Sequence, residues 1–238
     1  AFASIDDQGV ADYSFYVNNT ADWMWQPEEL PTVETIQELE GRAVQYGCLT
    51  MAMAPGNAVI EQWLAGIFDS DALTLSHDIN VRPALGHNRE TERERVEKLN
   101  RISTIIKASD ADIEWLYPDR DLEEVAQEWL GGLSKLVVIT KGADGALAFR
   151  GQDQIEIPGL VIDLEDTVGA GDTFMANLLV EMDTLAGLGD QPLKRIERLD
   201  IEDIERAVKI AVTASAVACE RAGAQPPTLR EIELKLEQ

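Results

Sequence analysis

The fold of this chain follows from the stretch Asp166-Thr167-Val168-Gly169-Ala170-Gly171-Asp172-Thr173-Phe174. Apolar residues at helical spacing come directly after it, namely Met175, Leu178, Leu179 and Met182. Two glycines around one alanine permit backbone angles closed to other residues and let a ligand approach the main chain closely. The first amide groups of a helix have no acceptor within it and carry about half a positive charge. The stretch therefore predicts a strand-to-helix turn that binds an anion such as a phosphoryl group.

Asp172 lies within this predicted cradle, where a carboxylate beside a phosphate is electrostatically unfavourable. General-base catalysis gives such a carboxylate a purpose, because it can accept the proton of an attacking hydroxyl. Phosphoryl transfer otherwise needs mostly positioning and charge stabilisation. The spacing alone leaves a second interpretation open, in which Asp172 is an ordinary capping residue of a glycine-rich turn. The stretch is neither a Walker A loop nor a dinucleotide fingerprint.

Composition narrows the class of protein. The formal net charge of −24 argues against a nucleic-acid partner, whose phosphates would be repelled. Hydrophobic residues make up 45% of the chain, enough for a substantial core, yet no run of 18 apolar residues indicates a membrane span. With two cysteines and no signal-peptide pattern, we expect no disulfide framework and a cytoplasmic location.

Strand and helix patterns alternate from residue 43 onward. We predict strands over 72–76, 104–107 and 136–140, a β excursion over 146–149 and 154–157, and helices over 90–101, 110–116, 121–130, 174–185 and 201–222. Residues 43–51 form a short apolar run, and Pro55 begins a further helix. This order predicts an α/β fold with a mostly parallel sheet, helices on both faces, and ligands beyond the carboxyl ends of the strands. Residues 2–17 read as a separate β-hairpin.

Residues 166–174 resemble the C-terminal signature of the ribokinase-like (PfkB) carbohydrate kinases, Asp-Thr-x-Gly-Ala-Gly-Asp-x-Phe. Other segments resemble family elements in the same order, most closely those of fructokinase-type members: residues 46–49, Asp78-Ile79-Asn80-Val81-Arg82, residues 107–116, 139–146 and 219–227. The N-terminal third of the family pattern has no counterpart here. We therefore expect a core that is incomplete on its N-terminal side, and a longer natural protein.

The resemblance implies a role for each matching residue. Asp172 would deprotonate a primary sugar hydroxyl, while the amides of Gly169, Ala170 and Gly171 hold the transferring phosphate and Arg82 lies near it. The nucleotide-binding residues would be Thr140, Gly142, Gly145, Lys107, Ala211 and Ser215. For the loop after residue 140 and for Arg82, a plain strand-end turn and a surface salt bridge remain the alternatives.

The family further implies ATP with Mg2+, and in many members K+. Asp112 would act on the magnesium through water, although a helix cap at Ser109 explains the same residues. The backbones of Asp166 and Val168, with the loop 221–225, are the candidates for the monovalent cation.

The hairpin segment, residues 1–22, would be the family's lid, and residues 23–238 the nucleotide-binding and catalytic core. Phe15 and Tyr16 would then face the sugar or the lid of a second subunit in a homodimer. Asp78 and Asn80 would line the sugar cleft, or merely cap the following loop.

The leading functional hypothesis is therefore an ATP-dependent, fructokinase-like sugar kinase. A 2-keto-3-deoxygluconate, ribose or nucleoside kinase of the same family remains open, because the absent segment carries most sugar contacts. A non-catalytic ligand-binding remnant is the third hypothesis, which the intact run 169–172 disfavours.

Overall fold

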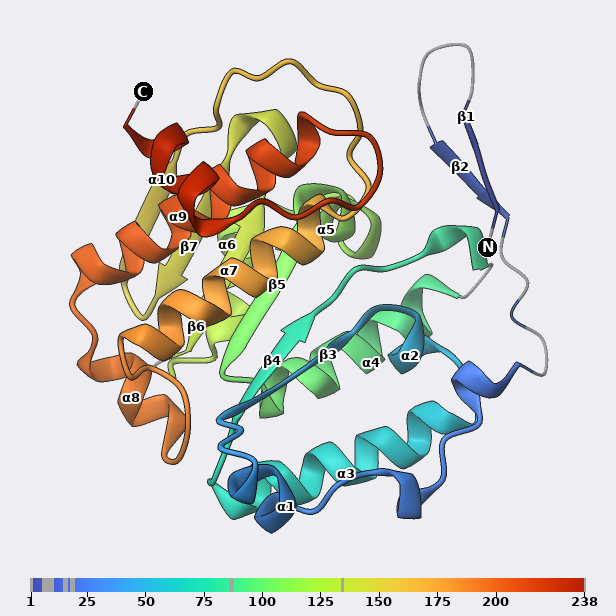
Figure 1. Ribbon diagram of the computed structural model, residues 1–238. Coiled ribbons are helices and arrows are strands. Elements are labelled where there is room, and N and C mark those ends of the chain that lie inside the picture. Colours follow the sequence, from blue (N-terminus) through green and yellow to red (C-terminus); the bar gives the residue numbers. More distant parts are fainter. Residues whose placement is uncertain are drawn as a thin grey trace.

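The computed structural model describes residues 2–5, 11–14, 17, 20–85, 88–133 and 135–237. Six strands form its main sheet in chain order (Figure 1): β3 (Ala43–Gly47), β4 (Thr74–Asp78), β5 (Ile105–Ser109), β6 (Leu136–Thr140), β7 (Ala146–Arg150) and β8 (Asp153–Ile157). The first four are parallel, and β7 and β8 each join antiparallel to the strand before. Four parallel strands bring their carboxyl ends to one edge of the sheet, where ligands bind in this class of fold.

Helices connect the strands and cover the sheet. They are α1 (Val33–Glu38), α2 (Cys48–Ala52), α3 (Gly56–Ser70), α4 (Arg89–Ile102), α5 (Asp110–Leu116), α6 (Leu122–Leu130), α7 (Ala170–Thr184), α8 (Pro192–Arg198), α9 (Ile201–Cys219) and α10 (Leu229–Leu236). Short 3-10 turns lie at Ala21–Trp23, Pro27–Glu29, Pro83–Leu85 and Gly142–Asp144. Within the described residues, no helix is both long and apolar enough to cross a membrane.

The two faces of the sheet bury different sets of side chains, as the period of two along a strand requires. From β6, Leu136 and Val138 pack against α7, α8 and α9, whereas Val137 and Ile139 pack against α4, α5 and α6. All four are fully buried. The predicted mostly parallel sheet with helices on both faces is therefore confirmed.

Helices α7 and α9 lie side by side over one face of the sheet (Figure 1). Alanines along α9 are buried at this contact, including Ala207, Ala211 and Ala214. Small side chains allow two helix backbones to approach closely, so α9 supports α7 along its length. This packing fixes the direction in which the first turn of α7 points.

Several element boundaries differ from those predicted. The strand β4 covers 74–78 and not 72–76, because Leu73 packs with α3 before the ladder begins. The apolar run 43–51 divides at Gly47, where the strand ends and α2 starts. The long helix ends at Cys219 and not at residue 222. The short helices α1, α8 and α10 were not predicted.

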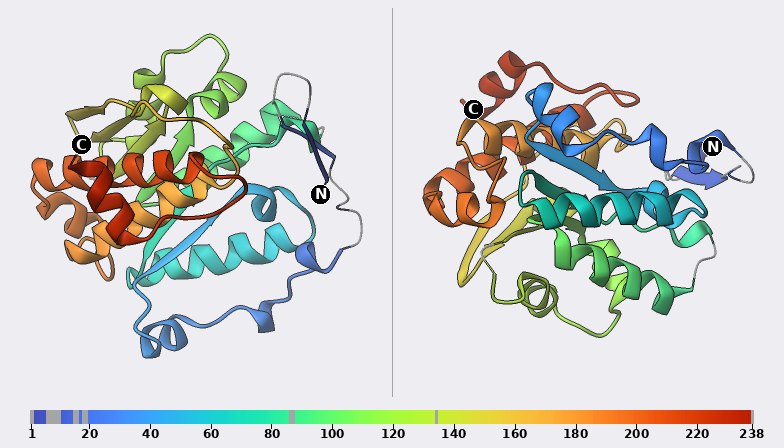
Figure 2. Two further views of the ribbon diagram at one scale, coloured as in Figure 1. Left: turned by 45° about the horizontal axis from the view of Figure 1, so that its top comes forward. Right: turned by 90° about the horizontal axis from the view of Figure 1, so that it is seen from below.

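The predicted N-terminal hairpin is present as β1 (Phe2–Ile5) and β2 (Ala11–Ser14), which pair antiparallel with Phe2 opposite Ser14. Figure 2 shows it apart from both helix layers, near the N-terminus. The predicted turn and the two aromatic residues Phe15 and Tyr16 lie outside the described residues.

Candidate active site

The first turn of α7 is built on Gly169, which caps the helix with φ +79°. A side chain is disfavoured there both by this left-handed backbone and by Ala224, whose Cβ would lie 3.0 Å from a Cβ at residue 169. The carbonyl of Gly169 accepts the N–H of Thr173 at 2.8 Å, and the N–H of Ala170 donates to Thr167 at 3.2 Å. The predicted glycine-rich helix start therefore exists, with the amide of Ala170 already engaged by the turn.

Asp166 secures the segment before the helix. Its carboxylate accepts the N–H of Val168 at 3.0 Å and the N–H of Gly223 at 2.8 Å. These backbone hydrogen bonds hold the pKa of Asp166 below its usual value. The loop after α9 is thus tied to the start of α7, which brings the predicted cation-site segments together.

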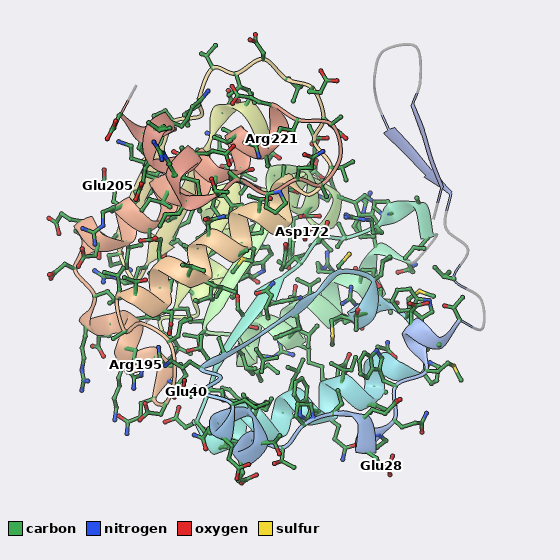
Figure 3. All side chains as sticks on the ribbon, in the orientation of Figure 1. Glu28, Glu40, Asp172, Arg195, Glu205 and Arg221 are labelled. Atoms are coloured by element: carbon green, nitrogen blue, oxygen red, sulfur yellow. The ribbon has the colours of Figure 1, made fainter. Side chains whose placement is uncertain are left out.

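Asp172 is the third residue of α7 and its side chain is exposed. Figure 3 shows it at the end of α7 nearest the loop that follows β4, with Arg195 far away at the other end of the helix layer. Its charge adds to the effects that raise the pKa of Asp78 and of Cys48, although burial is the main cause in both cases. Asp172 therefore faces the carboxyl ends of β3 and β4.

Asp78 and Lys107 form a buried ion pair behind this helix start. The Lys107 Nζ lies 3.1 and 3.2 Å from the two carboxylate oxygens of Asp78, and both side chains are less than one tenth exposed. The two residues are direct partners in the ladder between β4 and β5. The same Nζ lies 3.0 Å from the position a Cβ would take at Gly171.

Arg82 folds back onto the end of its own strand. Its guanidinium donates to the side chain of Asn80 and to the carbonyl of Val81, the latter at 3.1 Å. Asn80 has φ +41°, a left-handed conformation that asparagine tolerates better than most residues. Arg82 also lowers the pKa of the Cys48 thiol, against the stronger opposite effect of burial. Arg82 thus lies at the same edge of the sheet as Asp172.

Asp112 forms a capping box at the start of α5. Its carboxylate accepts from the N–H and the hydroxyl of Ser109, both at 2.8 Å, and from the N–H of Val81 at 2.9 Å. Both oxygens are therefore engaged by the protein. Within the described part of the chain, no group of three or more His, Cys, Asp or Glu side chains could hold a metal ion.

A cavity of about 560 Å³ lies on the other side of the α7 start. Predicted nucleotide residues Thr140, Gly142, Gly145 and Ser215 line it together with Ala170 and Gly171. Most of its remaining wall is apolar, from the loop after β8, from α7 and from α9: Leu160, Val161, Ile162, Leu164, Phe174, Val212, Ala216 and Cys219. An apolar wall next to the N-terminus of a helix suits a planar base carrying a phosphate chain.

Ser215 and Ala211 occupy different positions on α9. The Ser215 hydroxyl donates to the carbonyl of Ala170 at 3.0 Å, which links α9 to the first turn of α7. Ala211 is fully buried in the core below the cavity, one residue before Val212, which lines it. Lys107 likewise is not among the lining residues, and its ammonium lies behind Gly171.

Two parts of the site were missed by the sequence analysis. Cys48 begins α2 with φ +55° and lies in the electrostatic surroundings of Arg82 and Asp172. In the loop after β8, two apolar side chains that line the cavity are exposed, Leu164 largely and Val161 fully. Three apolar residues directly after Pro158-Gly159 were the available signal, since a solvent-facing loop seldom keeps such a run without a ligand to cover it.

The sequence profile of the pfkB family carbohydrate kinases matches residues 1–231. The chain belongs to this family. The resemblance stated from the sequence is thereby confirmed. Over 196 residues this pfkB-family chain is 33% identical to the fructokinase of Rhizobium leguminosarum bv. trifolii, and the match covers 78% of this chain and 58% of that protein. The chain thus spans less than two thirds of that relative's length.

Two solved fructokinases share the fold. The enzyme of Xylella fastidiosa with bound ATP superposes with a TM-score of 0.81 at 22% identity, over 99% of this chain and 72% of that one. The enzyme of Vibrio cholerae O395, bound to fructose, ADP and calcium ion, gives 0.75 at 22% identity, over 94% and 68% of the two chains.

Proposed function

We propose that this protein transfers the γ-phosphoryl group of ATP to a primary hydroxyl of a sugar, as a fructokinase-like kinase. The observation that carries the proposal is the position of Asp172. Its carboxylate stands in the first turn of α7, between a cavity that suits a nucleotide and the carboxyl ends of β3 and β4. A base is useful at such a place only if a hydroxyl and a phosphoryl group meet there.

The proposed reaction forms a bond between the sugar oxygen and the γ-phosphorus and breaks the bond from that phosphorus to the oxygen bridging it to the β-phosphorus. ADP leaves with the bridging oxygen, and Asp172 takes the hydroxyl proton and later releases it to solvent. The amide end of α7, at Gly169 and Gly171, stabilises the negative charge on the transferring group. Arg82 contributes a permanent cation if its guanidinium turns from Asn80 toward the phosphate.

The residues of the cavity fit ATP. Gly142 and Gly145 line it with φ of +53° and +92°, and without side chains they let a phosphate chain approach the main chain closely. Mg2+ would supply charge neutralisation on the β- and γ-phosphates when bound. The protein side chains do not fit a metal centre of their own, because Asp112 is engaged in its capping box. A K+ site would use backbone carbonyls of Asp166, Val168 and the loop 221–225.

The sugar is proposed from the relatives alone. The Vibrio cholerae enzyme holds fructose, and the Rhizobium relative is named a fructokinase. Asp78 offers little to a sugar in the geometry described, since both its oxygens accept from Lys107. Asn80 and the aromatic residues Phe15 and Tyr16 of the lid remain proposed sugar contacts, in a homodimer that pairs through its lids.

A coupled assay of ADP release tests the proposal over a panel of fructose, ribose, 2-keto-3-deoxygluconate and nucleosides, each with ATP. We expect turnover with fructose, and Asp172→Asn should lower kcat by about 10²–10⁴-fold while the KM for ATP changes little. Asp163→Asn, an exposed aspartate of the preceding loop, is the control and should keep wild-type kinetics. Equal kcat in Asp172→Asn and wild type would exclude the base, and no turnover with any sugar would favour a ligand-binding remnant.

A further inference from the structure

Lys107 lies between Asp78, at the end of β4, and the first turn of α7. It comes from the middle of the sheet, and its ammonium is buried with the side chain only 6% exposed. On one side it donates to both oxygens of Asp78. On the other side it reaches the first turn of α7, 3.0 Å from the Cβ position of Gly171. A buried ammonium is costly unless it is paired, and Asp78 supplies that pairing.

The glycine at residue 171 is explained by Lys107. Gly171 is the second residue of α7, and its φ is not positive, so its backbone conformation does not itself require glycine. Among the described residues outside its own helix turn, Lys107 Nζ is the one atom within 4 Å of the position that an alanine methyl would take. Because Asp78 holds this ammonium through two hydrogen bonds, Nζ cannot move aside freely. Glycine therefore keeps room for the lysine directly behind the wall of the nucleotide cavity.

The charges around this point are predominantly negative. Burial raises the pKa of Asp78, Asp112 and Asp172 add to that effect, and Lys107 opposes it. A phosphoryl group would bring further negative charge to the same place. The helix amides carry only about half a positive charge, so an uncompensated Asp78 behind the first turn would cancel much of it.

We propose that Lys107 is a positioning residue of the transfer site, whose ammonium neutralises Asp78 directly behind the start of α7 and thereby keeps the helix amides effective toward the transferred phosphoryl group. The inference rests on the proposed function, because it concerns the same step. It differs from a nucleotide contact in that Lys107 acts through Asp78 and α7, with Gly171 between its ammonium and the cavity.

Lys107→Met tests this role, with Lys135→Met as the matched control. Lys135 is also a buried lysine, but it donates to the carbonyls of Asn100 and Arg101 at the end of α4, away from the site. In Lys107→Met we expect kcat to fall by about 10–100-fold, with the KM for ATP and for the sugar within about threefold of wild type. Lys135→Met should keep kcat within about twofold at 25 °C. A Lys107→Met variant with kcat within threefold of wild type overturns the inference.

A second variant separates charge from packing. Asp78→Asn combined with Lys107→Met removes both charges and keeps the volume of both side chains, and buried pairs often tolerate such replacement. We expect the kcat of this double variant to be at least about tenfold higher than that of Lys107→Met, because no unpaired carboxylate remains behind α7. If the double variant has the same low kcat as Lys107→Met, the inference is wrong. It is also wrong if circular dichroism shows that an unfolded fraction of Lys107→Met accounts for the whole decrease in its kcat.

The two proposals fail in different ways. A wild-type protein that phosphorylates none of the sugars overturns the proposed function and this inference with it. An active wild type that depends on Asp172 and not on Lys107 overturns this inference alone.

Discussion

The Cα of Gly145 lies so close to the carbonyl oxygen of Ile157 that a Cβ on residue 145 would stand 2.1 Å from that oxygen. Gly145 directly precedes β7 and lines the cavity beside the start of α7, and Ile157 is the last residue of the paired strand β8. Both partners of this clash are backbone atoms, so no side-chain rotation can relieve it. Gly145 also has φ +92°, which disfavours any side chain.

Gly145→Ala should therefore distort the turn after β6. We expect a loss of more than about 2 kcal/mol in the free energy of unfolding and a large loss of ATP affinity. Gly132→Ala is the control, since Gly132 has φ +73° with no atom of the described residues within 4 Å of its Cβ position, and it should cost only about 1–2 kcal/mol. Urea unfolding and ATP titration measure both effects, and equal losses in the two variants would contradict this account.

Asp166→Ala should loosen the two segments that meet at the start of α7. The amides of Val168 and Gly223 would both lose their acceptor, and the loop 221–225 would no longer be tied to the helix start. We expect the KM for ATP to rise by about 3–10-fold, because two hydrogen bonds to a charged acceptor are lost near the cavity. Steady-state kinetics with Asp163→Ala as control measures this, and an unchanged KM would show that the loop holds its place without Asp166.

The sequence predicted those parts of the site whose chemistry is local. Gly169, Gly142 and Gly145 all have positive φ, a conformation that favours glycine, so the residue type itself indicates the turn. Strands β6 to β8 were also predicted well, since each is an uninterrupted apolar or alternating run bounded by turn residues.

The partnerships between distant residues could not be predicted. Lys107 and Asp78 are 29 positions apart, and only the register of β4 against β5 places them side by side. A lysine inside a strand gives no indication of which face it occupies until the neighbouring strand is placed. The same holds for Asp112, whose carboxylate reaches the N–H of Val81 across 31 positions. Sequence reasoning found these residues as members of family segments, and the structure adds their partners.

We expect His77 to make the stability of the protein sensitive to acid. Its ring is fully buried, stacks on Tyr46 with 4.9 Å between ring centroids, and its Nδ1 lies 2.7 Å from the Asn100 side chain. Burial, with Arg95 nearby, lowers the pKa of His77 to about 3. Below about pH 6.5 His77 is protonated in the unfolded chain but stays neutral in the folded protein. The free energy of unfolding should therefore fall as pH drops from 6.5 toward 3, with a slope of up to about 1.4 kcal/mol per pH unit.

His77→Phe keeps the ring stack and removes this titration. We expect the variant to be less stable at pH 7 by about 1–3 kcal/mol, because Asn100 loses its partner, but to lose less stability on acidification than wild type. Urea unfolding between pH 4 and pH 7.5 gives the two slopes. Parallel slopes would show that another group accounts for the acid sensitivity.

Lys135 should act at the opposite end of the pH range. Its ammonium is buried beneath the end of α4, and burial together with the charge of Arg101 lowers its pKa to about 8. As pH rises from about 8 to 10.5 the folded state releases this proton while the unfolded chain still holds it, so the free energy of unfolding should gain up to about 2–3 kcal/mol from this group. Lys135→Met removes the contribution, and the difference between the two proteins should shift by that amount between pH 7.5 and pH 10.5. Denaturant unfolding at matched ionic strength measures it, and a difference that is constant with pH would mean that Lys135 stays protonated in the fold.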